Sequence, residues 1–358
     1  MISKRLIGLM SGTSMDGVDI ADVQFTKSDV GKWSHEIMST HAVSYPRELL
    51  GKLSNSKSLP SEELTLLDKE ISLFFSKEVN TFIETNKINK TEIDAIASHG
   101  HTVFHQPEKG FTLQIGCGAI LASKTDLLVI NDFRTKDVIA GGQGAPLVPI
   151  GDSLLFSDKA DGFLNIGGFA NLCVLNEPII AFDISPGNLP INELMQKHHQ
   201  QNYDKDGLTA RCGSLIPKLL NDLNSIKHYS APPPKSLGTE WLDGTFTQII
   251  ENYADEGAND VIHTVTAHIA DQIVRSLNSL RVNSVMITGG GALNLFLIEL
   301  IRAKFRGNII LPERELIEYK EAIIFAFLGA LNLDNSVNTI PSVTGATNAV
   351  IGGVKHLP

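Results

Sequence analysis

Residues 11–17, with the sequence SGTSMDG, place two glycines, three hydroxyl side chains and a carboxylate in one short polar turn. Successive backbone N–H groups in such a turn can point at a phosphate, and the hydroxyls add further donors. Asp16 can hold Mg²⁺, directly or through water. The turn is not a P-loop, because GxxxxGK[ST] occurs nowhere in the chain. It predicts a phosphate site, with an ordinary polar turn as the alternative.

A second glycine-rich segment, GGGALN at residues 289–294, follows an apolar strand and opens a helix. Backbone without side chains lets a nucleotide base and ribose lie against it, near the helix N-terminus. The alternative is a tight strand-to-helix turn. The segment is not the GxGxxG dinucleotide fingerprint, and no ribose-binding acid follows at the expected distance.

Three histidines, His99, His101 and His105, form the pattern H-G-H-x₃-H. A spacing of two at a strand end puts both imidazoles on one side, as a zinc site requires. A zinc hydrolase also needs an acid, which Asp94 or Asp132 could supply. Hydrogen bonds from the histidines to a sugar or to the backbone are the favoured alternative.

Two charged residues near predicted turns are further candidates. Arg134 precedes a glycine-rich hinge and can clamp a carboxylate or phosphate through two parallel hydrogen bonds, or pair internally with Asp132 or Asp137. Asp183 ends a strand before a Ser-Pro-Gly-Asn turn. A carboxylate there can accept a proton from a hydroxyl or water, and a turn-capping role is the alternative.

The elements that position these residues follow a repeated plan. Residues 5–10 form an apolar strand, residues 11–17 the polar turn and residues 18–25 an alternating strand. Residues 162–176 repeat strand, glycine-rich turn and strand, which indicates an internal duplication; two unrelated hairpins are the alternative. Apolar residues at three- and four-residue steps predict long helices from residue 61 and over residues 260–280.

Composition limits the class of protein. With 358 residues, 42% of them hydrophobic, the chain is long enough for two domains. A net charge of −10 argues against a nucleic-acid-binding surface. Three widely spaced cysteines favour a reducing compartment. The longest uncharged run, residues 282–298, contains asparagines and the glycine triplet, so we expect no membrane association and a cytoplasmic location.

Ten motifs occur together in a fixed order along nearly the whole chain. They are SGTSMDG, SHGHTVFHQP, DFRTKDVIAGGQGAPLVP, NIGGFANL, FDISPGN, YDKDG, PPPKSLGTE, GGGALN, EAIIFAFL and PSVTGA. The set resembles the anhydro-N-acetylmuramic acid kinase family, which belongs to the actin, hexokinase and heat-shock-chaperone ATPase superfamily. This resemblance implies an α/β fold with two ribonuclease-H-like (actin-like ATPase) domains flanking a nucleotide cleft.

The resemblance also implies a division of the chain. Residues 1–138 would form domain I, with the first phosphate loop and the sugar contacts, and residues 331–358 would pack back on it. Residues 139–330 would form domain II, with the second phosphate loop, the catalytic aspartate and the adenosine loop. A homodimer is also implied.

The implied activity is an ATP- and Mg²⁺-dependent kinase that opens the 1,6-anhydro ring of anhydro-N-acetylmuramic acid with water and phosphorylates O6. The product, N-acetylmuramic acid 6-phosphate, is an intermediate of peptidoglycan recycling. Asp183 matches the family's catalytic aspartate and would be the base, and Glu321 matches an acid that assists with the water. The implied sugar contacts are His99, His101, Arg134 and Asn188. A non-catalytic ATP or sugar sensor of the same fold is a further alternative.

The implied nucleotide contacts come from three turns, and Asp16 would bind Mg²⁺. They are Ser11, Gly12, Thr13, Ser14, Met15, Asp16, Gly17, Val18 and Asp19 in the first turn; Asn165, Gly167 and Gly168 in the second; and Gly289, Gly290 and Gly291 in the third.

The chain departs from the family pattern at a few positions. His101 stands where a Gln is usual, Cys117 and Asn192 stand where Asp is usual, and Thr239 replaces an Arg. Asp183, Asn188, Lys235 and Glu240 keep the family residue. The expected chemistry is therefore retained, with altered sugar contacts.

Overall fold

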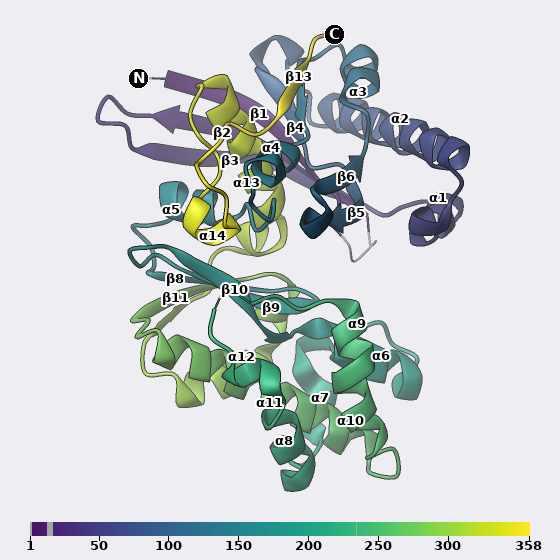
Figure 1. Ribbon diagram of the computed structural model, residues 1–358, viewed down its shortest axis with the longest axis vertical. Helices are drawn as coiled ribbons and strands as arrows, with labels where there is room; N and C mark the ends of the chain where they lie inside the picture. The colour runs from purple at the N-terminus through teal and green to yellow at the C-terminus, as the bar shows by residue number, and fades with distance from the viewer. Residues whose placement is uncertain (1, 13–16, 234) are drawn as a thin grey trace. The chain divides into compact units, whose positions relative to one another are not determined.

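The computed structural model describes residues 2–12, 17–233 and 235–358. The chain divides into two compact units, each with its own sheet (Figure 1). Unit 1 comprises Met1–Phe156 and Tyr319–Pro358, and unit 2 comprises Ser157–Glu318.

Unit 1 contains a six-stranded sheet in the order β13-β7-β4-β1-β2-β3. Strands β1, β2 and β3 form an antiparallel meander, β1, β4 and β7 are parallel, and β13 is antiparallel to β7. The strand bounds are β1 Ile2–Met10, β2 Val18–Lys27, β3 Trp33–Val43, β4 Ala95–Ser98, β7 Val129–Asn131 and β13 Val354–His356. A separate hairpin pairs β5 (His101–Gln106) with β6 (Phe111–Ile115).

Helices cover both faces of the unit 1 sheet. On one face, buried Ile71, Phe75 and Val79 of α2 pack with residues of β1, β4 and β7. On the other face α13 lies against β1 so closely that a Cβ at Gly8 would overlap the backbone of Ala322. The helix bounds are α1 Arg47–Ser54, α2 Ser61–Thr85, α3 Gly118–Thr125, α4 Thr135–Ile139, α5 Pro149–Leu155, α13 Arg314–Leu333 and α14 Pro341–Thr344.

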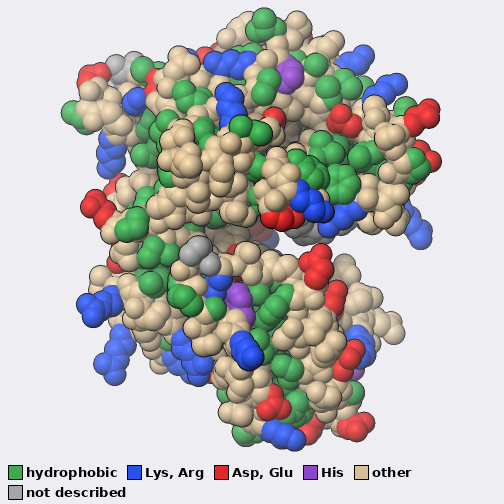
Figure 2. Space-filling model, viewed as in Figure 1, with side chains coloured by type: hydrophobic (Ala, Val, Ile, Leu, Met, Phe, Trp, Pro, Cys, Tyr) green, Lys and Arg blue, Asp and Glu red, His purple; other side chains and the backbone are tan. Residues whose placement is uncertain are grey.

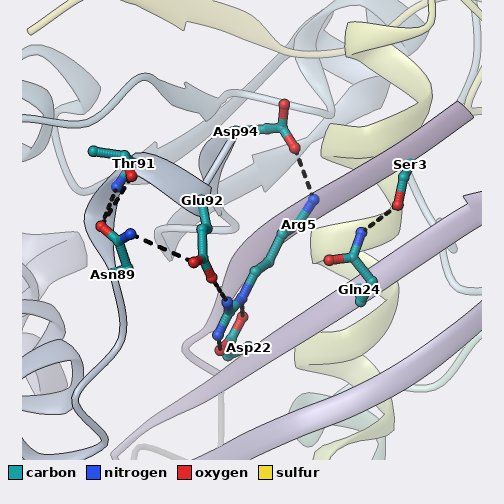
Figure 3. Close-up of polar contacts among 8 residues, drawn as sticks. All are labelled: Ser3, Arg5, Asp22, Gln24, Asn89, Thr91, Glu92 and Asp94. Atoms are coloured by element: carbon teal, nitrogen blue, oxygen red, sulfur yellow. Dashed lines mark hydrogen bonds and ion pairs between the residues drawn. The ribbon is translucent and has the colours of Figure 1, made fainter.

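The first half of β1 is held by charged groups (Figure 3). The Arg5 guanidinium bonds to both carboxylate oxygens of Asp22 on β2, at 3.0 and 2.8 Å, and to Glu92 at 2.7 Å. The backbone N–H of Arg5 donates to Asp94, just before β4. Because Asp22 is fully buried, this bidentate pair fixes β1 between its two neighbours.

Unit 2 contains a five-stranded sheet in the order β10-β9-β8-β11-β12. Strand β9 pairs antiparallel with both β8 and β10, and β11 pairs parallel with both β8 and β12. This matches β3-β2-β1-β4-β7 of unit 1, so the predicted duplication and the two ribonuclease-H-like units are confirmed. The strand bounds are β8 Gly162–Ile166, β9 Phe169–Val174, β10 Ile180–Pro186, β11 Ser284–Thr288 and β12 Asn308–Ile310.

The core of unit 2 forms around α11, whose buried residues include Val265, Ile269 and Ile273. The spacing of these three residues by four puts them on one helix face, as the sequence predicted. The helix bounds are α6 Asn188–His199, α7 Leu208–Cys212, α8 Pro217–Asn224, α9 Thr239–Trp241, α10 Gln248–Glu251, α11 Ala258–Ser279 and α12 Leu295–Lys304.

The unit boundaries differ from those expected at residues 138/139 and 330/331. Residues 139–156 belong to unit 1, where α5 packs against β3. Most of α13 also belongs to unit 1, and its Lys320 forms a buried ion pair with Asp152 of α5 at 2.6 Å. This pair joins two segments that the sequence pattern assigned to the other domain.

Acidic and basic side chains are interspersed on the face of the molecule in Figure 2. None of the helices described is both long and apolar enough to cross a lipid bilayer.

Candidate active site

The first predicted phosphate turn joins β1 to β2. Met10 and Asp19 pair across the two strands, so the turn begins and ends at neighbouring points. Ser11 is buried, and Val18 is buried at the start of β2. Within the turn, Gly12 and Gly17 are described, whereas Thr13, Ser14, Met15 and Asp16 lie outside the described residues.

A chain of three hydroxyl and imidazole groups includes Ser11, the first residue of this turn. The Tyr45 hydroxyl donates to Ser11 Oγ at 2.6 Å, and Ser11 Oγ lies 2.9 Å from Nδ1 of His101. Since the Tyr45 proton occupies Ser11 as acceptor, we assign the Ser11 proton to Nδ1 as acceptor, which puts the His101 proton on Nε2. Burial lowers the pKa of His101, so the ring is neutral at pH 7.

His99 and Arg134 form a second contact in unit 1. Nε and Nη2 of Arg134 lie 3.2 and 2.8 Å from Nε2 of His99, and Nη1 donates to the Gly144 carbonyl at 2.7 Å. Nδ1 of His99 lies 3.2 Å from the Ser11 carbonyl. His99 therefore accepts at Nε2 and donates at Nδ1, as a neutral ring. Burial first, and then the Arg134 charge, hold the pKa of His99 well below its usual value.

Arg134 does not form the internal ion pair considered from the sequence. Asp137 instead accepts from the Gly144 N–H and the Thr344 hydroxyl, both at 2.8 Å. Burial lowers the pKa of Arg134 to about 10, against the opposing attraction of Glu321 and Asp137. The guanidinium stays protonated at pH 7, and Glu321 of α13 is close enough to act on it.

The zinc site that the histidine spacing offered as an alternative does not form among the described residues. Arg134 and the Ser11 carbonyl engage both ring nitrogens of His99, and His105 Nδ1 lies 3.1 Å from the Thr112 hydroxyl. In the part of the chain that the structure describes, no group of three or more His, Cys, Asp or Glu side chains could hold a metal ion. The zinc hydrolase interpretation therefore has no metal site among the described residues.

In unit 2, the second predicted phosphate turn packs against the start of α6. The N–H groups of Gly187 and Asn188 donate to the carbonyls of Gly168 and Gly167, at 2.7 and 2.8 Å. The Asn188 side chain donates to the Ile166 carbonyl at 3.2 Å. These bonds hold the turn between β8 and β9 in one conformation, next to a helix N-terminus that can accept negative charge.

The third turn lies beside the second. A Cβ on Gly291 would overlap the side chain of Ile166, and Gly290 lies close to Asn188. Asn165, at the end of β8, accepts from the Thr288 hydroxyl of β11 at 3.4 Å. The structure thus brings the predicted residues Asn165, Gly167, Gly168, Asn188 and Gly289–Gly291 together within unit 2. The triplet continues as a short 3₁₀ turn, Gly290–Leu293, before α12 begins.

Asp183 lies on β10 at an irregularity in its pairing with β9, between Asp183 and Ser185. The N–H of Leu237 donates to Asp183 Oδ2 at 2.8 Å, and the N–H of Asp183 donates to the Lys235 carbonyl at 3.0 Å. Leu237 is the sole hydrogen-bond partner of this carboxylate among the described residues, so Oδ1 is available to a ligand. Burial raises the pKa of Asp183, and the Leu237 N–H partly opposes that rise.

Two of these supporting groups were not expected from the sequence. Tyr45 lies in a Tyr-Pro pair two residues after the end of β3, and a lone tyrosine before a proline near a strand end was the available signal. Leu237 acts through its backbone N–H, so its side chain gives no signal. Asp68 of α2 was not expected either: its Oδ1 accepts from the N–H groups of Gly116 and Cys117 at 2.6 and 3.0 Å.

Known proteins are similar to this chain along nearly its whole length. The family model described as anhydro-N-acetylmuramic acid kinase matches residues 4–357. A protein of that name from Francisella tularensis subsp. novicida is 36% identical over 98% of each chain. One from Haemophilus influenzae is 34% identical over 96% of this chain and 95% of its own. The chain therefore belongs to the anhydro-N-acetylmuramic acid kinase family and is a phosphotransferase with an alcohol group as acceptor.

Proposed function

We propose that this kinase uses ATP and water to convert anhydro-N-acetylmuramic acid to N-acetylmuramic acid 6-phosphate and ADP. Water forms a bond to the anomeric carbon, the bond from that carbon to O6 breaks, and O6 takes the γ-phosphoryl group. One proton is released overall, from the attacking water. In this reaction a base must accept that proton, and the phosphates need donors and countercharge.

The observation that carries the proposal is the environment of Asp183. The carboxylate has one backbone donor on Oδ2, and it lies on the strand that leads into the Gly187–Asn188 segment holding the second turn. The Leu237 N–H stabilises the ionised form, so Asp183 can take the proton from water. An anomeric carbon reacts through an oxocarbenium-like state, which a weak base is sufficient to assist.

The proposed nucleotide contacts are the glycine-rich turns of both units. Each presents backbone N–H groups without bulky side chains, which suits phosphate and ribose. Mg²⁺ in phosphoryl-transfer sites is held by one or two carboxylates together with the phosphates. Asp19, which pairs with Met10, and Asp16, outside the described residues, provide such a set. When bound, the ion would neutralise charge on the phosphates.

The proposed sugar contacts differ in their chemistry. His99 and His101 are neutral rings on rigid hydrogen-bond networks. All three guanidinium nitrogens of Arg134 form hydrogen bonds to His99 or Gly144, so its first role is to orient His99. Its positive charge also suits a carboxylate of the substrate. Glu321, near Arg134, would assist with the water, and Asn188 would contact the substrate from α6.

The proposal is tested by incubating the protein with ATP, Mg²⁺ and anhydro-N-acetylmuramic acid in H₂¹⁸O. We expect one ¹⁸O in the sugar product at the anomeric hydroxyl and none in its phosphate, as read by mass spectrometry of fragments. Label in the phosphate, or a phosphorylated product with the ring closed, would contradict coupled ring opening. The absence of ADP formation would favour the non-catalytic sensor instead. The peptidoglycan-recycling role, cytoplasmic location and homodimer implied by the resemblance stay predictions.

A further inference from the structure

Unit 2 contains a cavity of about 320 Å³ that no proposed step uses. It lies among β10, the segment after α8, and the second half of α11. Its lining includes Phe182 and Ile184, which alternate with Asp183 along β10, together with Tyr229, Lys235, Gln272 and Arg275. A volume of this size is at the lower end of pockets that bind small organic molecules.

The charge of this cavity is opposite to that of the whole chain. The chain has 40 acidic residues and a net charge of −10, yet no Asp or Glu lines the cavity, whereas Lys235 and Arg275 both do. The Arg275 side chain is exposed, and among the described residues no carboxylate or carbonyl is hydrogen bonded to its guanidinium. A guanidinium without a partner beside an acid-free cavity is suited to a phosphate or carboxylate.

One wall of the cavity is polar, and hydrogen bonds within the protein hold its side chains in place. Tyr229 and Asn224 both lie 2.9 Å from the ring of His268, at Nε2 and Nδ1 respectively. Gln272 donates to Asn224 Oδ1 at 2.6 Å. Burial lowers the pKa of His268 to about 3, so this network is uncharged and stays the same across neutral pH. A fixed wall reduces the entropy cost of binding a ligand.

The cavity shares a segment with Asp183. Lys235 Nζ donates to the His228 carbonyl at 2.9 Å, while the Lys235 carbonyl accepts the Asp183 N–H. His228 Nε2 lies 3.3 Å from the Asp183 carbonyl. The N–H of Leu237, two residues further on, donates to the Asp183 carboxylate. An anion that binds the Lys235 ammonium therefore contacts the segment that positions both the backbone and the carboxylate of Asp183.

We propose that this cavity is a binding site for a small organic anion, a phosphate or carboxylate on a body of about sugar size, held by Arg275 and Lys235. Occupancy tightens residues 228–237 and thereby the support of Asp183. This binding does not depend on the identity of the kinase substrate, so it can be tested separately from the proposed function.

Binding is tested by titrating the intact protein with glucose 6-phosphate, inorganic phosphate and glucose. Trp241 reports the event, because its ring lies 5.5 Å from that of His228 and 6.4 Å from that of Tyr229. We expect saturable changes in fluorescence and calorimetry with glucose 6-phosphate, weaker binding of phosphate, and none of glucose. Tighter binding of phosphate than of glucose 6-phosphate would contradict the proposal that the ligand has a body of about sugar size.

Charge-reversal variants locate the site. Arg275→Glu should weaken glucose 6-phosphate binding about tenfold or more, because a charge-assisted contact is replaced by repulsion. Arg306→Glu, an exposed arginine of unit 2 outside the cavity lining, should leave binding unchanged. Equal binding by both variants, or no calorimetric binding to the wild type up to about 10 mM, would overturn the proposal.

The link to Asp183 is tested by amide hydrogen exchange with and without glucose 6-phosphate. We expect slower exchange at the amides of Asp183 and Leu237 in the wild type, and no change in Arg275→Glu at the same ligand concentration. Binding without any change at these amides would overturn the coupling.

Discussion

The backbone N–H of Leu237 donates a 2.8 Å hydrogen bond to the carboxylate of Asp183, from a segment 54 residues further along the chain. The same segment accepts the Asp183 N–H at the Lys235 carbonyl. This segment therefore holds Asp183 at its backbone N–H and at one carboxylate oxygen. A side chain held this way loses little freedom when it acts on a substrate, which is the condition for efficient proton transfer.

Asp183→Asn should lower turnover by about 10²–10⁴-fold, because a neutral amide cannot accept the proton from water. The amide oxygen can still accept from Leu237, so the loss should fall on kcat more than on KM. ADP release in a coupled assay measures it. Asp255→Asn, an exposed acid of the same unit, is the matched control and should keep full activity. Undiminished turnover in Asp183→Asn would exclude it as the base.

The pH dependence of kcat/KM should show an acid limb above the range of an exposed aspartate. Burial raises the pKa of Asp183 above its ordinary value of 3.8, and only the ionised form accepts a proton. Activity is therefore present above the raised pKa and is lost as the pH falls through it. The residual activity of Asp183→Asn should lack this limb. A limb that persists in the variant would belong to another group, such as the nucleotide.

Local sequence patterns predicted the helices and strands of this fold better than the contacts between distant segments. The strand–turn–strand units and the helices α2 and α11 follow from two- and four-residue periodicity, which each segment carries in its own sequence. The Leu237–Asp183 bond depends on where residues 235–237 lie against β10. That path is set by packing between distant segments and leaves no periodic trace.

The histidine pattern also shows that local spacing does not identify the partners of a side chain. A spacing of two correctly indicated that His99 and His101 lie close together, yet it could not distinguish a metal site from a hydrogen-bonded one. The distinction rests on Arg134, 35 residues beyond His99, whose guanidinium occupies the nitrogen that a metal would need. The unit boundaries depend in a similar way on distant contacts, because α5 packs against β3 and α13 packs against Gly8 of β1.

Arg134→Met should destabilise unit 1 by about 1–3 kcal/mol for each buried acceptor left without a donor, namely Nε2 of His99 and the Gly144 carbonyl. It should also raise the pKa of His99 relative to the wild type, because the Arg134 charge is lost, while burial still keeps it below 6.5. Chemical denaturation and NMR titration of the histidine ring protons measure the two effects. Arg47→Met, an exposed arginine, is the control.

The sign of the pH effect follows from the depressed pKa of His99. Below the unfolded value of about 6.5, the unfolded chain binds a proton that native His99 does not, so this group makes stability rise with pH. Arg134→Met should flatten that slope. An unchanged His99 pKa in the variant would show that Arg134 does not act on the ring.

Lys320→Met should strongly destabilise unit 1. It leaves the Asp152 carboxylate buried without its partner, and breaking a buried pair from one side costs about 3–5 kcal/mol. Trp33, the tryptophan of unit 1, reports the unfolding transition by fluorescence. Lys57→Met, at an exposed position of the same unit, should leave the transition unchanged.

The double variant Lys320→Met/Asp152→Leu separates charge from packing. If the unpaired carboxylate causes the loss, the double variant should recover most of the stability that Lys320→Met loses, because two apolar side chains of similar volume then face each other.

The pH dependence of the stability of Lys320→Met gives an independent check. Burial raises the pKa of Asp152 and Lys320 opposes that rise, so removing Lys320 raises this pKa further. A raised native pKa makes stability fall as pH rises through the interval above the unfolded value, and the deficit of Lys320→Met should therefore shrink between pH 7 and pH 5. A double variant as unstable as the single one, with a deficit independent of pH, would assign the loss to the shape of the Lys320 side chain instead of its charge.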